Sequence, residues 1–165
     1  MTKHTTFLGL GSNMGNRKRN LMQAITKIRT LIGNIVCQST FLVSEPWGYR
    51  STHRYLNACV KVETELSPRE LLDTIKSIEQ QMGRTTHSVK DYDTGVMIYA
   101  DRPIDIDILL YDDIRIDEPD LKIPHPQMFQ RPFVMQPLSE ICDEETLRQA
   151  ASNHKSRSSL SHIDQ

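Results

Sequence analysis

The chain has 165 residues, of which 25% are charged, and its formal net charge at pH 7 is -1. This length is typical of one compact domain, and the near-neutral charge excludes a broad electrostatic attraction to nucleic acid or to a membrane surface. The three cysteines share no Cys-x-x-Cys spacing, which argues against a disulfide framework or a zinc site and favours a reducing cytoplasm. We expect no targeting segment and no membrane span.

The first half of the chain alternates between strand and helix patterns. Residues 6–12 have the alternation of a strand, and apolar residues between 21 and 32 follow helical spacing with Gly33 as a stop signal. Residues 35–43 and 55–64 are typical of two further strands, joined by a loop rich in turn residues.

The second half begins with a clear helix signal. Ser67-Pro-Arg-Glu70 is a capping box with proline at the first helical position, and the apolar spacing carries this helix to Gly83. A polar segment over 84–100 follows, and a loop of this length inside a compact domain is usually functional. A strand is expected within 101–111, followed by a hairpin through Asp112 and Asp113.

The element order is strand, helix, two strands, helix, strand. It predicts an α+β fold, a ferredoxin-like sandwich with a mainly antiparallel sheet, helices on one face and an open face for a site. Residues 1–150 are expected to form the single domain. Residues 151–165 are Ser- and His-rich with few apolar side chains, so we expect a flexible tail in which His154 is solvated.

An acidic pair interrupts the apolar strand near residue 105. Because successive side chains of a strand point to opposite faces, Asp105 and Asp107 share one face while Ile104, Ile106 and Ile108 share the other. Aspartate is disfavoured in strands, so two on one face require a reason. Magnesium takes hard oxygen ligands, often one or two carboxylates together with substrate phosphates. The pattern therefore favours a magnesium site.

The same alternation predicts what lies beside this acidic pair. Tyr55 and Asn57 fall on the open side, next to Gly9 and Gly11, whose missing side chains leave room close to the backbone. An aromatic ring can stack on a flat heterocycle, and an amide can give and accept hydrogen bonds along its edge. Together with metal-binding carboxylates, this set indicates phosphoryl-type transfer onto a planar heterocyclic acceptor.

Several short segments, taken in order, carry a resemblance to a known family. They are Phe7-Leu-Gly-Leu-Gly-Ser-Asn13, Tyr55-Leu-Asn57, Ile78-Glu-x-x-x-Gly-Arg84, Arg102-Pro-Ile-Asp-Ile-Asp107, and Ile123-Pro-His-Pro126 followed by Arg131-Pro-Phe133. Over residues 5–137 the chain resembles 6-hydroxymethyl-7,8-dihydropterin pyrophosphokinase. That family transfers the terminal pyrophosphate of ATP to a pterin alcohol and releases AMP in folate biosynthesis.

The resemblance implies a role for each matching position. Asp105 and Asp107 would hold two Mg²⁺ ions, and Arg84 and Arg102 would be the catalytic arginines. Pterin contacts would come from Ser44, Glu45, Trp47, Tyr55, Asn57 and Phe133. ATP contacts would come from Leu72, Lys76, Glu79, Arg84, Tyr99, Arg102, Ile108, Lys122, His125 and Arg131. The chain departs from the family pattern at Tyr99, where a tryptophan is common. It also departs at Asp120, where the family often has a lysine that contacts phosphate, and we expect Lys122 to take over that contact.

Three alternatives stay open from the residues alone. A palm-type nucleotidyl transferase has a similar sheet and acidic pair, but its nucleic-acid substrate favours a basic groove that the net charge does not indicate. An RNA-binding module would be opposed by the aspartates, which repel phosphates. A non-catalytic pterin-binding relative would be expected to lose an aspartate or an arginine. We expect small-molecule partners, with no nucleic acid or membrane, and a monomer is compatible with the sequence.

Overall fold

The computed structural model describes residues 2–45, 54–83, 89–90, 97–98 and 102–163. In chain order the elements are β1 (His4–Ser12), α1 (Arg17–Leu31), β2 (Gly33–Gln38), β3 (Leu42–Ser44), β4 (Tyr55–Thr64), α2 (Pro68–Gln81), β5 (Val89–Lys90), β6 (Met97–Ile98), β7 (Asp105–Tyr111), β8 (Ile116–Glu118), β9 (Leu121–Ile123), the 3-10 helix η1 (Met128–Gln130), α3 (Pro132–Ile141) and α4 (Glu144–Ile163). Within these residues, no helix is both long enough and apolar enough to cross a membrane.

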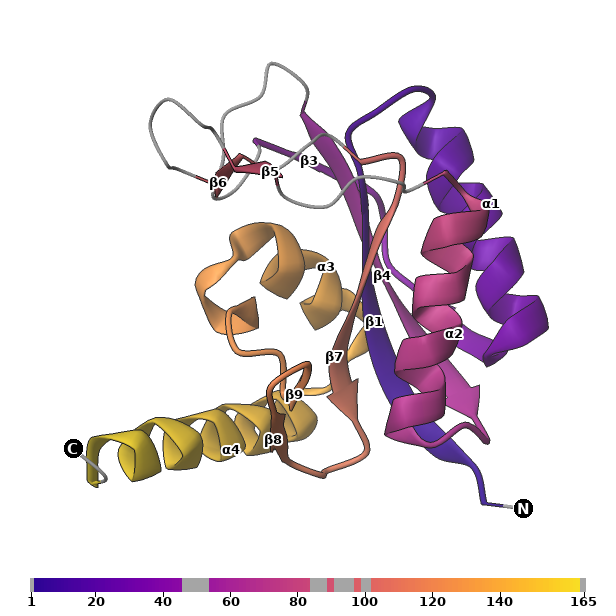
Figure 1. Ribbon diagram of the computed structural model, residues 1–165. Coiled ribbons are helices and arrows are strands. Elements are labelled where there is room, and N and C mark those ends of the chain that lie inside the picture. Colours follow the sequence, from indigo (N-terminus) through magenta and orange to yellow (C-terminus); the bar gives the residue numbers. More distant parts are fainter. Residues whose placement is uncertain (1, 46–53, 84–88, 91–96, 99–101, 164–165) are drawn as a thin grey trace.

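The central sheet has the topology that the element order predicts. Its strands lie in the order β2, β4, β1, β7, with β3 paired to β4, and all of these pairs are antiparallel. Helices α1 and α2 lie side by side against one face of the sheet (Figure 1). This is the ferredoxin-like sandwich expected from the sequence, and β7, which carries the acidic pair, is an edge strand of the sheet.

Local sequence explains where the two long helices begin. The Ser67 hydroxyl accepts the Glu70 N–H while the Glu70 carboxylate accepts the Ser67 N–H, which is the predicted capping box of α2. Asn16 caps α1 by accepting the N–H of Arg19. Helix α1 ends at Leu31 with Ile32 as its C-cap, directly before Gly33 as the stop signal predicts, and Gly33 is also the first residue of β2. A Cβ at Gly33 would lie 1.9 Å from the Glu63 carbonyl oxygen, so only glycine allows this close strand contact.

The two faces of the sheet bury different clusters. The first cluster fills the space between the sheet and helices α1 and α2, and it contains Ile104, Ile106 and Ile108 as the alternation predicts. The second cluster lies on the opposite face, where Phe7, Cys59, Leu109 and Leu110 of the sheet pack against Met128, Val134, Leu138, Cys142 and Ala150. Helix α3 and the start of α4 therefore cover part of this face, and the remainder is left for a cavity.

A β-bulge in β7 adds an extra residue of this strand to the second cluster. Phe7 pairs with Leu110 and Leu8 pairs with Ile108, so Leu109 is an extra residue on β7. Leu109 and its neighbour Leu110 both belong to the second cluster, although successive strand residues normally face opposite ways. The bulge thus leaves the alternation intact at the acidic pair and adds apolar surface beyond it.

Three elements differ from the sequence predictions. The strand expected over 35–43 is two strands, β2 and β3. Ser39 still donates its N–H to the Cys59 carbonyl of β4, but the Thr40 N–H donates to the Glu140 carboxylate instead. The hairpin expected at Asp112 does not form with β7. Asp112 has a positive φ of 47° and bonds back to the start of β1, and the next hairpin is β8 with β9. The segment expected as a tail continues α4 to Ile163, and its flexibility stays a prediction.

Candidate active site

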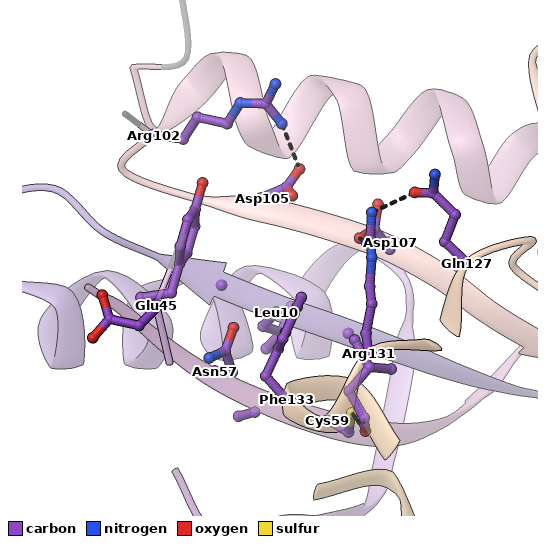
Figure 2. Close-up of a pocket in the computed structure, with 15 residues that line it drawn as sticks. Leu10, Glu45, Asn57, Cys59, Arg102, Asp105, Asp107, Gln127, Arg131 and Phe133 are labelled. Carbon is purple, nitrogen blue, oxygen red and sulfur yellow. Dashed lines mark hydrogen bonds and ion pairs between the residues drawn. The ribbon is translucent and has the colours of Figure 1, made fainter. Parts of the chain in front are cut away.

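A cavity of about 310 Å³ opens on the uncovered half of the second face, between the sheet and the turn that leads into α3. Figure 2 shows Asp105, Asp107, Asn57 and Phe133 around this one space. The lining residues are Gly9, Leu10, Gly11, Glu45, Tyr55, Asn57, Ala58, Cys59, Arg102, Asp105, Asp107, Gln127, Arg131, Phe133 and Val134. The cavity is therefore lined at one end by charge and at the other by rings and an amide.

The acidic pair is held in place by the backbone of β7. Asp105 pairs with Gly11 and Asp107 pairs with Gly9 of β1, so both carboxylates lie above glycines. The N–H of Ile106, which lies between them, donates to the buried carboxylate of Glu79 on α2 at 2.9 Å. This bond ties the edge strand to the helix layer at the position between the two aspartates.

Cationic side chains surround the two carboxylates. Arg102 Nη1 donates to Asp105 Oδ1 at 3.4 Å, and Arg131 Nη1 lies 4.0 Å from Asp107 Oδ2. His125 Nε2 lies 4.0 Å from Asp107 Oδ1. Burial raises the pKa of Asp107 above its usual value, the charge of Asp105 raises it further, and the two arginines offset this only in part. The geometry and charge of the pair therefore favour an additional cation at this end of the cavity.

The donor set matches a hard cation that shares its ligands with a substrate. Among the described residues, no group of three or more His, Cys, Asp and Glu side chains is placed to hold a metal ion. Two carboxylates alone leave most of an octahedral magnesium shell for water and phosphate oxygens. The site therefore suits Mg²⁺ bound jointly by protein and substrate better than a closed structural metal centre.

The turn from Ile123 to Gln127 delivers polar groups to the acidic pair. His125 Nδ1 accepts the N–H of Gln127 at 3.2 Å, so in a neutral ring the hydrogen is on Nε2, on the side of Asp107. Gln127 Oε1 in turn accepts from Arg131 Nη2 at 2.5 Å. His125, Gln127 and Arg131 thus form one connected set beside Asp107, with two of them predicted from sequence.

The opposite end of the cavity is suited to a flat polar ring. Asn57 is buried, and its Nδ2 donates to the Leu42 carbonyl at 3.0 Å and to the Ser44 hydroxyl at 2.7 Å. Both amide hydrogens are thereby used, so Asn57 presents Oδ1 as an acceptor. A Cβ at Gly11 would lie 3.3 Å from this oxygen and 3.3 Å from the Tyr55 ring, so glycine keeps this corner open.

The remaining predicted residues fall into three groups. Phe133 lines the cavity below the Arg131 guanidinium, whose Cζ is 5.8 Å from the ring centroid, and Glu45 lines it while paired with Arg54. Leu72 and Ile108 turn toward the first cluster, so their side chains belong to the core, whereas Lys76 is exposed and Lys122 pairs with Asp117 at 2.7 Å. Trp47, Arg84 and Tyr99 lie outside the described residues.

Several lining residues were not predicted from sequence. Cys59 follows the same alternation as Asn57, so that pattern places it on this face without indicating a role. Gln127 directly follows the Pro-His-Pro turn, and its contact with Arg131 depends on a turn geometry that the sequence does not encode in a recognisable way. Val134 reaches the cavity because α3 crosses the second face.

Comparisons with known proteins agree on one family. Residues 7–143 match the family model described as 7,8-dihydro-6-hydroxymethylpterin-pyrophosphokinase. A Porphyromonas gingivalis protein named 2-amino-4-hydroxy-6-hydroxymethyldihydropteridine pyrophosphokinase is 44% identical over 136 residues, which cover 82% of this chain and 88% of that protein. The Bacillus subtilis protein of the same name is 34% identical over 139 residues, which cover 84% of this chain and 78% of that protein.

Solved structures show the same fold at low identity. A crystal structure of an HPPK-DHPS in complex with substrates superposes with a TM-score of 0.67 at 14% identity, covering 95% of this chain and 44% of that chain. The Plasmodium falciparum HPPK-DHPS triple mutant has a TM-score of 0.65 at 14% identity and covers 94% of this chain and 43% of that chain. This chain thus spans less than half of those longer chains, and the likeness to them concerns the fold.

Proposed function

The chain belongs to the 7,8-dihydro-6-hydroxymethylpterin-pyrophosphokinase family, and on this premise we propose how its cavity transfers pyrophosphate from ATP to the hydroxymethyl group of 6-hydroxymethyl-7,8-dihydropterin. The products are AMP and the pterin pyrophosphate, and the reaction is a step of folate biosynthesis. One observation carries the assignment of the site: the Asp105–Asp107 pair and the Tyr55–Asn57 pair face the same cavity.

Asp105 and Asp107 hold magnesium in this proposal. Burial and, after it, the nearby charge of Asp105 raise the pKa of Asp107, and a bound divalent cation would offset both. When bound, two Mg²⁺ ions supply Lewis-acid polarisation of the phosphate and alcohol oxygens and screen the triphosphate charge. Glu79 keeps the two ligands in register through its bond to Ile106.

The ring end of the cavity binds the pterin. Tyr55 and Phe133 offer aromatic faces for the bicyclic ring, and Asn57 Oδ1 accepts a hydrogen bond from an N–H on its edge. Ser44 contributes by fixing the amide of Asn57. We assign Glu45 and Trp47 to the rim of this pocket on the resemblance alone.

The turn and the arginines bind ATP. Arg131 and the Nε2–H of His125 are placed beside Asp107 to contact phosphate oxygens, and Arg102 is placed beside Asp105. The other predicted ATP contacts, which the resemblance alone supports, are Leu72, Lys76, Glu79, Arg84, Tyr99, Ile108 and Lys122. Because the Ile108 side chain is in the core, we expect Ile108 to contact ATP through its main chain.

The chemistry needs no covalent enzyme intermediate. The hydroxymethyl oxygen attacks the β-phosphorus of ATP in line, an O–P bond forms, and the bond from the β-phosphorus to the bridging oxygen of AMP breaks. The residues around the acidic pair align these atoms, and Arg102, Arg131 and Arg84 neutralise the charge that develops on the phosphates. The hydroxyl proton leaves to solvent or to a nearby carboxylate.

We also propose a reducing compartment, the cytoplasm, for this reaction. All three cysteines, Cys37, Cys59 and Cys142, are free thiols in the described structure. Burial raises the pKa of the Cys59 thiol to about 12, so it stays protonated on the cavity wall. A small apolar thiol suits a wall that a neutral ring approaches.

The test is to incubate the protein with ATP, Mg²⁺ and 6-hydroxymethyl-7,8-dihydropterin and to identify the nucleotide product. AMP that forms only when the pterin is present supports the proposal. Release of ADP, or of free pyrophosphate as in nucleotidyl transfer, contradicts it. The exposed Asp113, beyond the end of the same strand, provides a matched control: Asp113→Asn keeps normal AMP formation, whereas Asp105→Asn loses it.

A further inference from the structure

The structure assigns a positioning role to His154, a residue of α4 that lies beyond the segment matched by the family model. We propose that His154 braces the turn carrying His125 and Gln127, and so sets the affinity of the site for ATP. The inference rests on the proposed function for the identity of the ligand, and on the described contacts for the brace itself.

Helix α4 is docked by a stripe of side chains on one side. Leu147 packs against the second cluster and Ala150, which is 4% exposed, belongs to it. His154 follows at the next helical turn, so these three residues line one face of α4. Asn153 Nδ2 adds a bond of 3.4 Å to the Asp113 carbonyl. Helix α4 is thus fixed below α3 and beside the β8–β9 hairpin as far as this point (Figure 1).

His154 is the last residue of this stripe, and it contacts the turn beside the cavity. Its Nε2 lies 2.8 Å from the Pro126 carbonyl oxygen. A carbonyl only accepts, so His154 Nε2 carries the hydrogen and donates it. The ring also contacts Phe129 of η1, with the centroids 5.2 Å apart and the planes tilted by 60°. One side chain therefore contacts both the turn and the short helix that follows it.

Pro126 lies between His125 and Gln127, the two residues of the turn that lie on the side of the acidic pair. The turn is anchored at its near end by the His125 N–H, which donates to the Leu109 carbonyl at 3.0 Å. Prolines 124 and 126 have no N–H to donate, so side chains and neighbouring strands must supply part of what fixes the turn. The bond from His154 holds the Pro126 carbonyl, and with it the placement of His125 and Gln127.

A chain of contacts connects this brace to the acidic pair. Gln127 Oε1 accepts from Arg131 Nη2 at 2.5 Å, Arg131 lies 4.0 Å from Asp107, and His125 lies 4.0 Å from the same carboxylate. Loosening Pro126 therefore displaces the groups proposed to contact the phosphates. Asn57, at the ring end of the cavity, is held instead by the Leu42 carbonyl and the Ser44 hydroxyl.

The test uses two substitutions at His154 and one matched control on the same helix. His154→Phe keeps a ring against Phe129 and removes the donor, whereas His154→Gln restores a donor of similar reach. Ser152→Ala changes an exposed residue two positions away. We expect His154→Phe to raise the KM for ATP by about 3- to 10-fold, the loss of one hydrogen bond, with the KM for the pterin unchanged. His154→Gln and Ser152→Ala stay within about twofold of wild type.

A second measurement keeps the brace testable apart from the reaction. In protein labelled with ¹⁵N-histidine, His154→Phe should shift the His125 ring signals while His4 keeps its own. Should the wild type make no AMP, the proposed function fails, and the His125 signals still decide the brace. Unchanged His125 signals, or a KM that rises equally for both substrates alongside a lower melting temperature, would overturn the positioning role.

Discussion

The two faces of β7 share one backbone, but one face packs into the core and the other carries the acidic pair. On one face Ile106 and Ile108, together with Ile104 just before the strand, are buried against the helices, and on the other Asp105 and Asp107 enter the cavity. Each isoleucine removes apolar surface from water, which favours folding. Each aspartate brings a charge to a partly buried position beside a like charge, which opposes folding. The strand therefore derives its stability from one face and its chemistry from the other.

This contrast explains why the backbone around the acidic pair is so strongly held. Glycines 9 and 11 oppose the aspartates across the ladder, and Glu79 accepts the N–H of Ile106 from the helix side. Repulsion between Asp105 and Asp107 would otherwise move the edge strand. Substitutions on the two faces should consequently separate loss of activity from loss of stability.

The largest effect is expected for Asp107→Asn. An amide keeps the size of the side chain and loses the charge that holds the metal, so kcat should fall by about 10³-fold or more while the protein stays folded. Steady-state AMP formation and a circular dichroism spectrum measure the two quantities. A variant with normal turnover would show that Asp107 is not a metal ligand.

The opposite face should give the opposite result. Ile106→Ala removes a buried side chain that is 5% exposed, and we expect the free energy of unfolding to drop by about 2–5 kcal/mol. Urea denaturation measures this loss. The fraction that stays folded at low temperature should keep a kcat within about threefold of wild type, because the carboxylates are untouched. A large fall in kcat with unchanged stability would reverse the assignment of the faces.

The spacing of apolar residues and local capping signals were enough to predict the helices and strands and the face of the acidic pair. The alternation around Ile106 and the capping box at Ser67 each depend on residues close in sequence, and both are confirmed. The topology followed from the order of these elements. The pairing of the acidic strand with glycines was also accessible, because Gly9 and Gly11 have the same period as the strand itself.

What the sequence did not predict depends on contacts between distant segments. His154 was expected in solvent, yet α4, which begins directly after the residues matched by the family model, brings its ring to Pro126, 28 residues away. The cover that α3 provides over part of the second face follows from Cys59 and Val134 packing together across 75 residues. The split of the expected strand at Thr40 depends on Glu140, 100 residues further along.

The ring end of the cavity allows a smaller and more selective effect. Ser44→Ala removes one of the two acceptors that fix the Asn57 amide, so the KM for the pterin should rise by about 2- to 10-fold. The KM for ATP should stay the same, since the contacts around Asp107 are unaffected. Ser77→Ala, an exposed position on α2, serves as the control. Equal changes in both KM values would mean that the two ends of the cavity are not independent.

The smallest effect concerns stability and pH in metal-free protein. The pKa of Asp107 is raised in the folded state by burial and by the charge of Asp105, so the folded protein binds this proton more tightly than the unfolded chain. The stability that this carboxyl contributes is complete below its unfolded pKa, near 4. It is lost as pH rises through the higher folded pKa.

Asp107→Asn removes this dependence, so above the folded pKa the variant should be more stable than metal-free wild type. Melting temperatures of both proteins from pH 4 to pH 9 in EDTA measure the difference. Hydrogen bonds from Thr40 lower the pKa of Glu140, so the stability that Glu140 contributes is lost as pH falls. Glu140 is present in both proteins, so its contribution does not affect the difference between their melting temperatures. Mg²⁺ should reverse the ranking, because only the wild type gains binding free energy in the folded state. Parallel curves for the two proteins in EDTA would show that the acidic face costs no stability, and the division of labour between the faces of β7 would fail.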